Sequence, residues 1–460
     1  MKRKTPMSGN ISPWLHNLKR ERPEHELTGA KYADICVLGG GIAGVSTAYE
    51  LLKKTDKKII LIEGGKIAHG ATGHNGGYAI ADFEKKFEDI VRENGLYEAR
   101  QGLKELDDAV IEWDKISNML NLRHVDRQPS IEAFSDVEHF VALLHEMHLK
   151  YGELKFPFYL IEGSNWIDSV PENFKSHVKI LNEEEFKKVL RTQDIDTKIY
   201  QGVFIEEMGI GNSAEFSESL AKYCLEKYGD RFQIFENSFV SSIRLEQNGG
   251  IILDSLRGVA VVQNLVLCTN GFENFNIYGP YNRSINTIFH HTVSGLIGYM
   301  IGSFRKGKVR DEVGGVFFGK EFKYGNDPIK SGPYYYYTNR HFTVDGEDGE
   351  LVCLGGPELD LEERKVYRKD HEMDKAVSDN LRDFQKKILG VQEEPIFKWH
   401  GLMGYTQSGV RVVGRDVRFS NLYYNLGCNG IGLIPSIAGA KRIARLLSGE
   451  KLPRSVFDPR

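Results

Sequence analysis

Three glycines at a fixed spacing, Gly39, Gly41 and Gly44, follow an apolar run at residues 33–38 and precede a helix-like stretch that reaches Lys54. The first glycine permits a tight turn from strand to helix, the second lets backbone approach a pyrophosphate, and the third lets helix and strand pack closely. The N-terminus of such a helix presents free N–H groups and a partial positive charge to phosphates. The pattern predicts the first strand, turn and helix of a dinucleotide-binding unit.

A second apolar run, residues 58–62, ends on Glu63. Its separation from the glycines is close to the ~20 residues expected for the acidic residue that accepts hydrogen bonds from a ribose. The glycine pattern alone would be weak evidence, but here it follows a strand, precedes a helix and has an acid after the next strand. We therefore interpret the segment as a βαβ dinucleotide site with Glu63 at the adenosine ribose.

The size and composition of the chain narrow its class. A chain of 460 residues exceeds what one hydrophobic core normally serves, so we expect two domains. With 27% charged residues and a formal net charge of −4, nothing indicates a nucleic-acid-binding or disordered protein. The five cysteines form no Cys-x-x-Cys pair, so we expect neither a disulfide framework nor a metal site. The sequence has no signal peptide and no run of ~18 apolar residues, so we expect a cytoplasmic protein without a transmembrane segment.

Periodicity predicts alternating helical and strand-rich blocks along the rest of the chain. Apolar residues recur at intervals of three and four from residue 83 to residue 149, which predicts helices there, one of them capped by Ser135. The tyrosine run at 334–337 and the apolar run at 351–355 predict a β-hairpin, with alternate tyrosines on opposite faces of the strand. Dinucleotide-binding signals occur in three separated pieces, which indicates interleaved domains.

Several segments together resemble the D-amino-acid oxidase superfamily of FAD enzymes over nearly the whole chain. The N-terminal segment and Asn75-Gly76-Gly77 are similar to the branch that contains γ-glutamylputrescine oxidase and related amine and amino-acid oxidoreductases. The chain departs from that branch at Thr72 and His74, where Ser-Gly-Arg is usual. The segments that carry the resemblance are 39–44, the second strand ending on Glu63, 71–77, 267–271, 399–406 and 427–432 with Pro435.

The resemblance implies an α/β fold, α+β overall, in which a Rossmann-like FAD-binding domain is interleaved with a substrate domain of antiparallel sheet and helices. The implied segments are a leader at 1–30, an FAD-binding domain at 31–85, 200–280 and 392–460, and a substrate domain at 86–199 and 281–391. FAD rather than NAD is the implied cofactor. The residues expected to contact it are Gly39, Gly41, Ile42, Ala43, Gly44, Glu63, Ala71, Thr72, Gly73, His74, Asn75, Gly76, Gly77, Val240, Thr269, Asn270, Gly271, Gly401, Gly430, Ile431, Gly432 and Leu433.

The activity implied by the resemblance is oxidation of the C–N bond of an amine or amino acid. Hydride would pass to flavin N5, the resulting imine would be hydrolysed by water, and oxygen or another acceptor would reoxidise the flavin. The expected partners are thus a small-molecule amine or amino acid and an electron acceptor, with no nucleic acid. Two alternatives stay open: an FAD-dependent 2-hydroxy-acid or glycerol-phosphate dehydrogenase, and a flavin-binding accessory protein without turnover.

Few catalytic side chains are expected, because the cofactor carries out the difficult step. His74 stands in the flavin-facing loop, where it can donate a hydrogen bond to the flavin or bond to its ring methyl; we predict the hydrogen bond. Tyr336 lies on a strand that borders the substrate in the family, although it can equally be a core residue. Arg340 can bind a substrate carboxylate or form a surface salt bridge. His400 can line the substrate cavity or be a satisfied core histidine.

Overall fold

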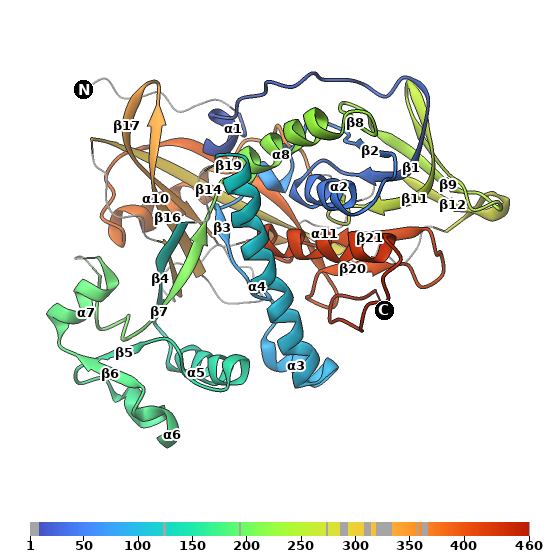
Figure 1. Ribbon diagram of the computed structural model, residues 1–460. Coiled ribbons are helices and arrows are strands. Elements are labelled where there is room, and N and C mark those ends of the chain that lie inside the picture. The colour runs from blue at the N-terminus through green and yellow to red at the C-terminus, as the bar shows by residue number, and fades with distance from the viewer. Residues whose placement is uncertain are drawn as a thin grey trace.

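The computed structural model describes residues 9–122, 126–192, 195–272, 275–285, 293–307, 314–318, 334–356, 358–360 and 367–459. These residues form two large β-sheets with covering helices, and the chain passes from one sheet to the other several times (Figure 1). The expected fold class is confirmed: a Rossmann-like sheet is interleaved with a second, mostly antiparallel sheet. None of the helices in these described ranges is long and apolar enough to cross a membrane.

The first sheet contains the predicted dinucleotide-binding unit. Its order runs β8-β2-β1-β11 with all neighbours parallel, and β21 lies parallel to the end of β11. Leu38 pairs with Ile62, so the loops that follow β1 and β2 leave the sheet at the same edge. The strands are β1 (Gly29–Leu38), β2 (Ile59–Ile62), β8 (Phe232–Phe235), β9 (Val240–Leu245), β10 (Ile251–Ser255), β11 (Gly258–Leu267), β12 (Asn276–Gly279), β13 (Arg283–Ser284), β20 (Val412–Arg415) and β21 (Leu422–Leu426).

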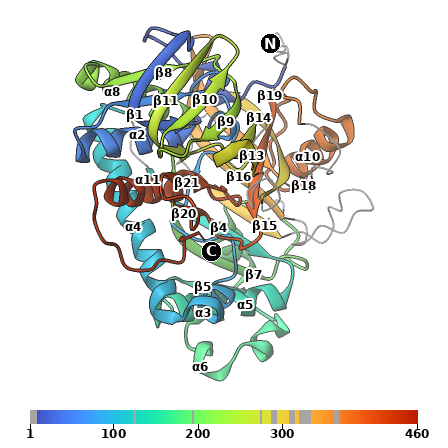
Figure 2. The same ribbon diagram turned by 90° about the vertical axis from the view of Figure 1, so that its right-hand side faces the viewer.

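Helices cover one face of this sheet. Ile35 and Val37 of β1 pack into the core shared with the helices, whereas Cys36 and Leu38 pack into a separate core with the β9–β10 meander. Because both faces are buried, the strands are continuous apolar runs. Helix α2 packs between α8 and α11 (Figures 1 and 2). The helices are α1 (Pro13–His16), α2 (Ile42–Lys54), α3 (Phe87–Asn94), α4 (Leu96–Met119), α5 (Val137–Tyr151), α6 (Glu172–Lys175), α7 (Glu183–Leu190), α8 (Ser213–Tyr228), α10 (Lys375–Lys387) and α11 (Leu433–Leu447).

The second sheet has one face covered by α7 and α10. Its order runs β18-β14-β17-β16-β15-β4-β7-β5-β6, with β19 beside β14 and β3 beside β7. The strands are β3 (Tyr78–Ala79), β4 (Asp126–Phe134), β5 (Phe158–Ile161), β6 (Val178–Leu181), β7 (Gly202–Ile210), β14 (Val293–Lys306), β15 (Gly314–Phe318), β16 (Tyr334–Val344), β17 (Glu347–Gly355), β18 (Leu359–Asp360) and β19 (Pro395–Thr406).

The helical prediction for residues 83–149 is wrong in one part. Helices α3, α4 and α5 occur there, but β4 lies between α4 and α5 and pairs with β7 and β15. Those partners are remote in sequence, so local periodicity could not reveal them. The predicted cap is also wrong by one residue: Asp136 caps α5 by accepting from the N–H of Glu138, and Ser135 donates to the carbonyl of Phe318.

The predicted hairpin is confirmed, with longer strands than expected. β16 and β17 pair from Tyr336 opposite Gly355 to Val344 opposite Glu347. The turn is therefore the two residues Asp345 and Gly346, which have φ values of +54° and +77°. Two positive φ angles are the signature of the type I′ turn that matches the twist of paired strands.

The expected segment boundaries do not follow the sheets everywhere. β7 and β19 lie in segments assigned to the FAD-binding domain, yet both are hydrogen-bonded into the second sheet. The N-terminal segment, expected as a separate leader, places Ser12 and Trp14 in the interior with exposures of 0% and 1%. Motif positions alone could not indicate either feature, because both depend on pairing with distant residues.

Candidate functional site

The turn between β1 and α2 needs its glycines for steric reasons. Gly39 has a φ of +110°, and a Cβ on it would lie 2.5 Å from the carbonyl oxygen of Cys268. A Cβ on Gly44 would overlap the carbonyl oxygen of Gly39, and one on Gly41 would lie 2.9 Å from Thr72 Oγ1. Gly41 is the N-cap of α2 and has no side chain to cap it. The first turn of α2 therefore offers backbone N–H groups to an anion.

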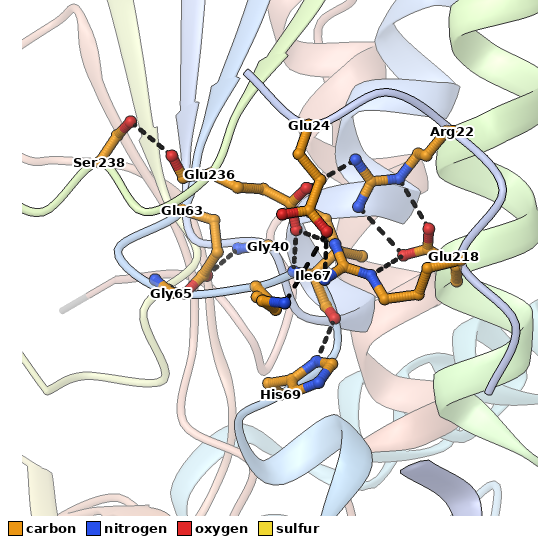
Figure 3. A network of polar contacts seen from close by, with 12 residues as sticks. Arg22, Glu24, Gly40, Glu63, Gly65, Ile67, His69, Glu218, Glu236 and Ser238 are labelled. Atoms are coloured by element: carbon orange, nitrogen blue, oxygen red, sulfur yellow. Dashed lines mark hydrogen bonds and ion pairs between the residues drawn. The ribbon is translucent and has the colours of Figure 1, made fainter. Parts of the chain in front are cut away.

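Glu63 lies beside this turn, directly after β2 (Figure 3). Its carboxylate accepts hydrogen bonds from the N–H groups of Gly40 and Gly65, each at 2.7 Å. These bonds fix the carboxylate at the carboxyl edge of the parallel strands, from which an acidic residue reaches a ribose. Each carboxylate oxygen keeps a lone pair for a ribose hydroxyl.

Asn75 fastens the glycine-rich loop at residues 71–77. Its amide donates to the carbonyl of Thr72 at 2.6 Å and to Ser213 Oγ at 2.8 Å, and its Oδ1 accepts from the N–H of Gly77 at 2.8 Å. The Thr72 hydroxyl accepts from the N–H of Ile42 at 2.9 Å. This loop is thus bonded to the first turns of both α2 and α8.

The other segments expected to contact the cofactor, at 269–271, 401–404 and 427–433, contact one another and the 71–77 loop. Asn270 Oδ1 accepts from the N–H of Cys428 at 2.8 Å, and the Asn270 carbonyl packs against Gly404. Gly401 packs so closely against the carbonyl of His74 that a Cβ would overlap it. The segments at 71–77, 269–271, 401–404 and 427–433 therefore converge, although they are far apart in the sequence.

These residues fit FAD. The carboxyl ends of β1, β2 and β11 bring together two helix N-termini without side-chain caps, those of α2 and α11. Glu63 lies at the same edge, and Val240 begins β9 with 3% exposure. A dinucleotide needs this combination of N–H donors, backbone in close approach and one acidic residue.

The His74 ring faces two backbone carbonyls. Nδ1 lies 2.9 Å from the oxygen of Gly70, and Nε2 lies 3.2 Å from the oxygen of Asn10. Burial lowers the pKa of His74, so the ring is neutral and donates one of these hydrogen bonds at a time. His74 thus lies in the expected loop. Its two ring nitrogens face the backbone of the loop, at Gly70, and of the N-terminal segment, at Asn10.

His400 also has partners for both ring nitrogens. Nδ1 lies 3.0 Å from the Tyr367 hydroxyl, and Nε2 lies 2.8 Å from the carbonyl oxygen of His371. Its backbone bonds in both directions to the Asn10 side chain. The side chain is 3% exposed and burial lowers its pKa. This environment matches the satisfied core histidine among the two expected alternatives.

Arg340 is not a surface residue. Its guanidinium carbon lies 4.3 Å from the ring centre of Trp14, and Nη1 donates to the carbonyl of Gly211 at 3.4 Å. A Cβ on Gly77 would lie 2.5 Å from Nη2. With 8% exposure, Arg340 is buried against Gly77 of the 71–77 loop and does not lie on the surface, as the salt-bridge alternative assumed.

The tyrosines of β16 alternate as expected. Tyr335 and Tyr337 are buried in the core under α10, where Tyr335 stacks on Phe384 at 4.1 Å. Tyr334 and Tyr336 point to the other face, into a group that we call the tyrosine–carboxylate cluster. Its members are Glu84, Tyr334, Tyr336, Glu358 and Tyr405.

Glu358 is the centre of the tyrosine–carboxylate cluster. Its two oxygens accept from the hydroxyls of Tyr334 at 2.9 Å and Tyr405 at 2.7 Å. Glu84 is exposed, but the protein atoms around it reduce its solvation, and this desolvation, with repulsion from Glu358 and Asp82, raises its pKa to about 8. Burial also raises the pKa of Glu358.

The tyrosine–carboxylate cluster lies against two cofactor loops. A Cβ on Gly430 would be 2.6 Å from the Tyr405 hydroxyl and 3.1 Å from Glu84 Oε2, and one on Gly76 would be 3.3 Å from the ring of Tyr336. Of its members, only Tyr336 was a sequence candidate. Glu84 lies at the start of the segment predicted to be helical and Glu358 lies in a polar segment, and no sequence signal distinguished either from a surface acid.

The N-terminal segment is a second feature that sequence reasoning missed. Trp14 Nε1 donates to the carbonyl of Asn75 at 2.7 Å, and Ser12 Oγ donates to the carbonyl of Gly73. Ser12 also caps α1, with Pro13 at the first helical position. Serine followed by proline is a helix-start signal, so the short helix could have been found, but its contact with the loop could not.

Arg22 anchors this segment to the first sheet through a buried ion network (Figure 3). Its guanidinium lies 2.7 Å from Glu236 and 2.9 Å from Glu218, with side-chain exposures of 2%, 0% and 5%. Glu236 also accepts from the N–H of Ile67 at 2.7 Å. The network thus joins the N-terminal segment, α8 and the chain that leads to the 71–77 loop.

A hollow of about 830 Å³ lies elsewhere, between residues 14–21, the end of α4, α8 and β16. Arg340 and Gly211 line it, but none of the glycine-rich segments does. We therefore assign the cofactor to the converging loops and not to this hollow.

Comparisons with known proteins agree with this geometry. The chain is 27% identical over 264 residues to a probable oxidoreductase, OrdL, of Haemophilus influenzae, a match that covers 56% of this chain and 54% of that protein. It is 33% identical over 67 residues to the gamma-glutamylputrescine oxidoreductase of Escherichia coli, covering 15% of this chain and 16% of that one. The matches therefore span about half or less of the length of these curated relatives.

Solved structures share the fold at low identity. The L-proline dehydrogenase of P. horikoshii superposes with a TM-score of 0.63 at 16% identity, covering 93% of this chain and 94% of that one. The glycine oxidase of Geobacillus kaustophilus gives 0.63 at 15%, covering 92% and 96%. An L-alpha-glycerophosphate oxidase of Mycoplasma pneumoniae with FAD bound gives 0.62 at 14%, covering 93% and 98%.

The family model described as FAD dependent oxidoreductase matches residues 34–446. This range includes the turn at 39–44, Glu63, the 71–77 loop and the C-terminal glycine-rich loop. The expected resemblance and the expected FAD cofactor are confirmed. The chain belongs to the family of FAD-dependent oxidoreductases that includes the D-amino-acid oxidases.

Proposed function

We propose that the protein oxidises the C–N bond of a small-molecule amine or amino acid, with oxygen or another acceptor receiving the electrons in the end. The observation that carries the proposal is the position of the tyrosine–carboxylate cluster against the loops of Gly76 and Gly430. FAD, when bound, takes up the hydride that leaves the carbon next to the nitrogen. Relatives whose names state action on glycine, L-proline or gamma-glutamylputrescine support this reaction class.

The carboxylates of the cluster have a direct role in this proposal. Only a neutral amine has the lone pair that assists loss of hydride, so the ammonium form must first lose a proton. A group with a pKa near the working pH is suited to accept it. Glu84, with a pKa of about 8, is the residue that we assign to this proton. Glu358, held by two tyrosine hydroxyls, attracts and orients the ammonium group.

The same charges argue against the alternative of a 2-hydroxy-acid or glycerol-phosphate dehydrogenase. A 2-hydroxy acid or a glycerol phosphate carries a negative charge and, unlike an amine or amino acid, no ammonium group, so the ionised forms of Glu84 and Glu358 repel it. No cationic partner of Glu84 or Glu358 occurs among the residues that the structure describes. The chemistry of this cluster therefore favours a cationic substrate.

The test is an anaerobic screen in which the yellow holoprotein is mixed with amines, amino acids and hydroxy acids. Reduction of the flavin is measured as bleaching of its yellow colour. We expect amines to bleach the flavin, faster as the pH rises, and hydroxy acids to leave it yellow. Glu358→Gln should raise the apparent Kd for the reactive amine about tenfold, the effect of one lost charge-assisted contact. Bleaching by a hydroxy acid alone would overturn the proposal, and no bleaching by any pool would favour the non-catalytic alternative.

A further inference from the structure

The second sheet carries further acidic side chains on the same face as Tyr336. Side chains alternate along each strand, and the strands β16, β15, β4 and β7 pair without a register shift. Glu132 and Glu206 therefore share the face of Tyr334 and Tyr336. The residues that occupy the opposite face, under α7 and α10, are Ile131, Val203, Tyr335 and Tyr337.

The register places these residues in adjacent rows. Val316 pairs with Tyr336 on one side and with Glu132 on the other. Tyr336 and Glu132 are thus two strand spacings apart, or about 10 Å. In the next row, Ser130 of β4 stands directly opposite Glu206 of β7. One strip of sheet therefore leads from the tyrosine–carboxylate cluster to Ser130, Glu132 and Glu206.

Among the described residues, the carboxylates of Glu132 and Glu206 have no bonding partner. Neither forms a hydrogen bond or an ion pair with any residue in the described part of the chain. The charged groups around them are Asp82, Glu146 and Lys150, and the Lys150 ammonium already pairs with Asp82 and Glu146. Burial and mutual repulsion raise the pKa of Glu132 to about 8, and burial with repulsion from Asp82 raises that of Glu206 to about 7.

Ser130 provides an independent indication of a ligand. Its side chain is 1% exposed, and its Oγ has no hydrogen-bond partner in the described ranges. A buried hydroxyl left without a partner costs about 1–3 kcal/mol, which a hydrogen bond to a bound ligand recovers. Ser130 and the two carboxylates all accept hydrogen bonds, and an ammonium group offers three donors and a positive charge.

An organic cation fits this place better than a metal ion. No group of three or more His, Cys, Asp or Glu side chains in the described residues is arranged to hold a metal. Val316 and the ring of Tyr336 lie between the tyrosine–carboxylate cluster and the carboxylates of Glu132 and Glu206. These side chains are apolar or aromatic and suit a methylene chain. A negatively charged tail would meet repulsion at both places.

Building on the proposed amine oxidation, we infer that Ser130, Glu132 and Glu206 form a second cation subsite that binds the distal ammonium group of an aliphatic diamine or polyamine. The reacting amine lies beside Tyr336, Glu84 and Glu358, and the methylene chain crosses Val316. This assignment replaces the expected carboxylate partner at Arg340, which is turned toward Trp14 and Gly77.

The test compares three ligands of equal chain length on the unmodified holoprotein: an α,ω-diamine, the corresponding monoamine and the corresponding ω-amino acid. Binding is measured by equilibrium dialysis and flavin reduction by anaerobic bleaching. We expect the diamine to bind about tenfold more tightly than the monoamine, because one charge-assisted contact is added. The ω-amino acid should bind least well. Equal Kd values for diamine and monoamine would overturn the subsite.

Variants test whether Glu132 and Glu206 cause the tighter binding of the diamine. In Glu132→Gln and Glu206→Gln, the ratio of monoamine Kd to diamine Kd should fall toward one. Glu207→Gln is the matched control, because Glu207 is the exposed neighbour on the opposite face of β7 and its loss removes the same charge. If Glu207→Gln lowers the ratio as much, only net charge matters and the subsite is wrong. If the diamine binds with this dependence but no amine bleaches the flavin, the proposed oxidation fails while the subsite stands.

Discussion

The hydroxyl of Thr72 accepts a hydrogen bond from the backbone N–H of Ile42 at 2.9 Å. This single contact joins the 71–77 loop to the first turn of α2, the two elements expected on either side of the cofactor. Thr72 also occupies one of the two positions at which the chain departs from the branch of the family that it resembles. The hydroxyl thus compensates in part for the missing side-chain cap of α2.

We predict that Thr72→Val weakens FAD binding about tenfold. Valine keeps the shape of threonine but leaves the Ile42 N–H without its acceptor and frees the loop, at a cost of about 1 kcal/mol or somewhat more. The Kd for FAD is measured by titrating the apoprotein. Thr55→Val is the control, because the Thr55 hydroxyl bonds to the Leu51 carbonyl at the other end of α2. Equal losses in both variants would mean that helix stability, and not the loop contact, controls binding.

For His74 we predict a flavin that is released by acid precipitation. Both ring nitrogens face backbone carbonyls, so neither is free to attack the flavin ring. His74→Ala should keep FAD but slow its reduction several-fold, because the loop loses its contacts with Gly70 and Asn10. His69→Ala is the control, since His69 bonds to the carbonyl of Ile67 in the same stretch of chain. Flavin that stays in the acid pellet would establish the covalent alternative.

The outcome for these residues shows which parts of the site a sequence can reveal. The positions of the glycines and Glu63 could be predicted, because they depend on local backbone and on spacing within one βαβ unit. Glu132 and Glu206 were not found, because they come together only through the face of the second sheet that they share, and Glu84 and Glu358 lie in irregular segments whose neighbours are remote in sequence. That face is set by pairings between strands as remote in sequence as β4 and β15, which no local pattern records.

We predict that Arg22→Met destabilises the fold by about 3 kcal/mol. The change leaves Glu218 and Glu236 buried with less compensation, and breaking one partner of a buried pair is far more costly than breaking a surface pair. The free energy of unfolding is measured by urea denaturation of the FAD-saturated protein. Arg257→Met is the control: its salt bridge to Glu26 has side-chain exposures of 67% and 41%, so its loss should cost less than about 1 kcal/mol.

Glu132 and Glu206, the two acids of the proposed subsite on the second sheet, make the free energy of unfolding fall as the pH rises. The pKa values of Glu132 and Glu206, about 8 and about 7, lie above the value of 4.5 for a free glutamate. Between pH 4.5 and pH 8 the folded chain therefore holds protons that the unfolded chain releases, and these two groups stabilise the fold less as the pH rises through that range.

The double variant Glu132→Gln and Glu206→Gln removes both titrations. We expect its free energy of unfolding to fall less than that of the unmodified protein between about pH 5 and pH 8, by an amount on the order of 1 kcal/mol after allowance for solvent screening. Urea denaturation of the FAD-saturated proteins at several pH values measures the difference, with Glu207→Gln as the control that should follow the unmodified protein. If the free energy of unfolding changes with pH equally in the double variant and the unmodified protein, the two carboxyls titrate normally. That result would remove the electrostatic basis of the proposed subsite.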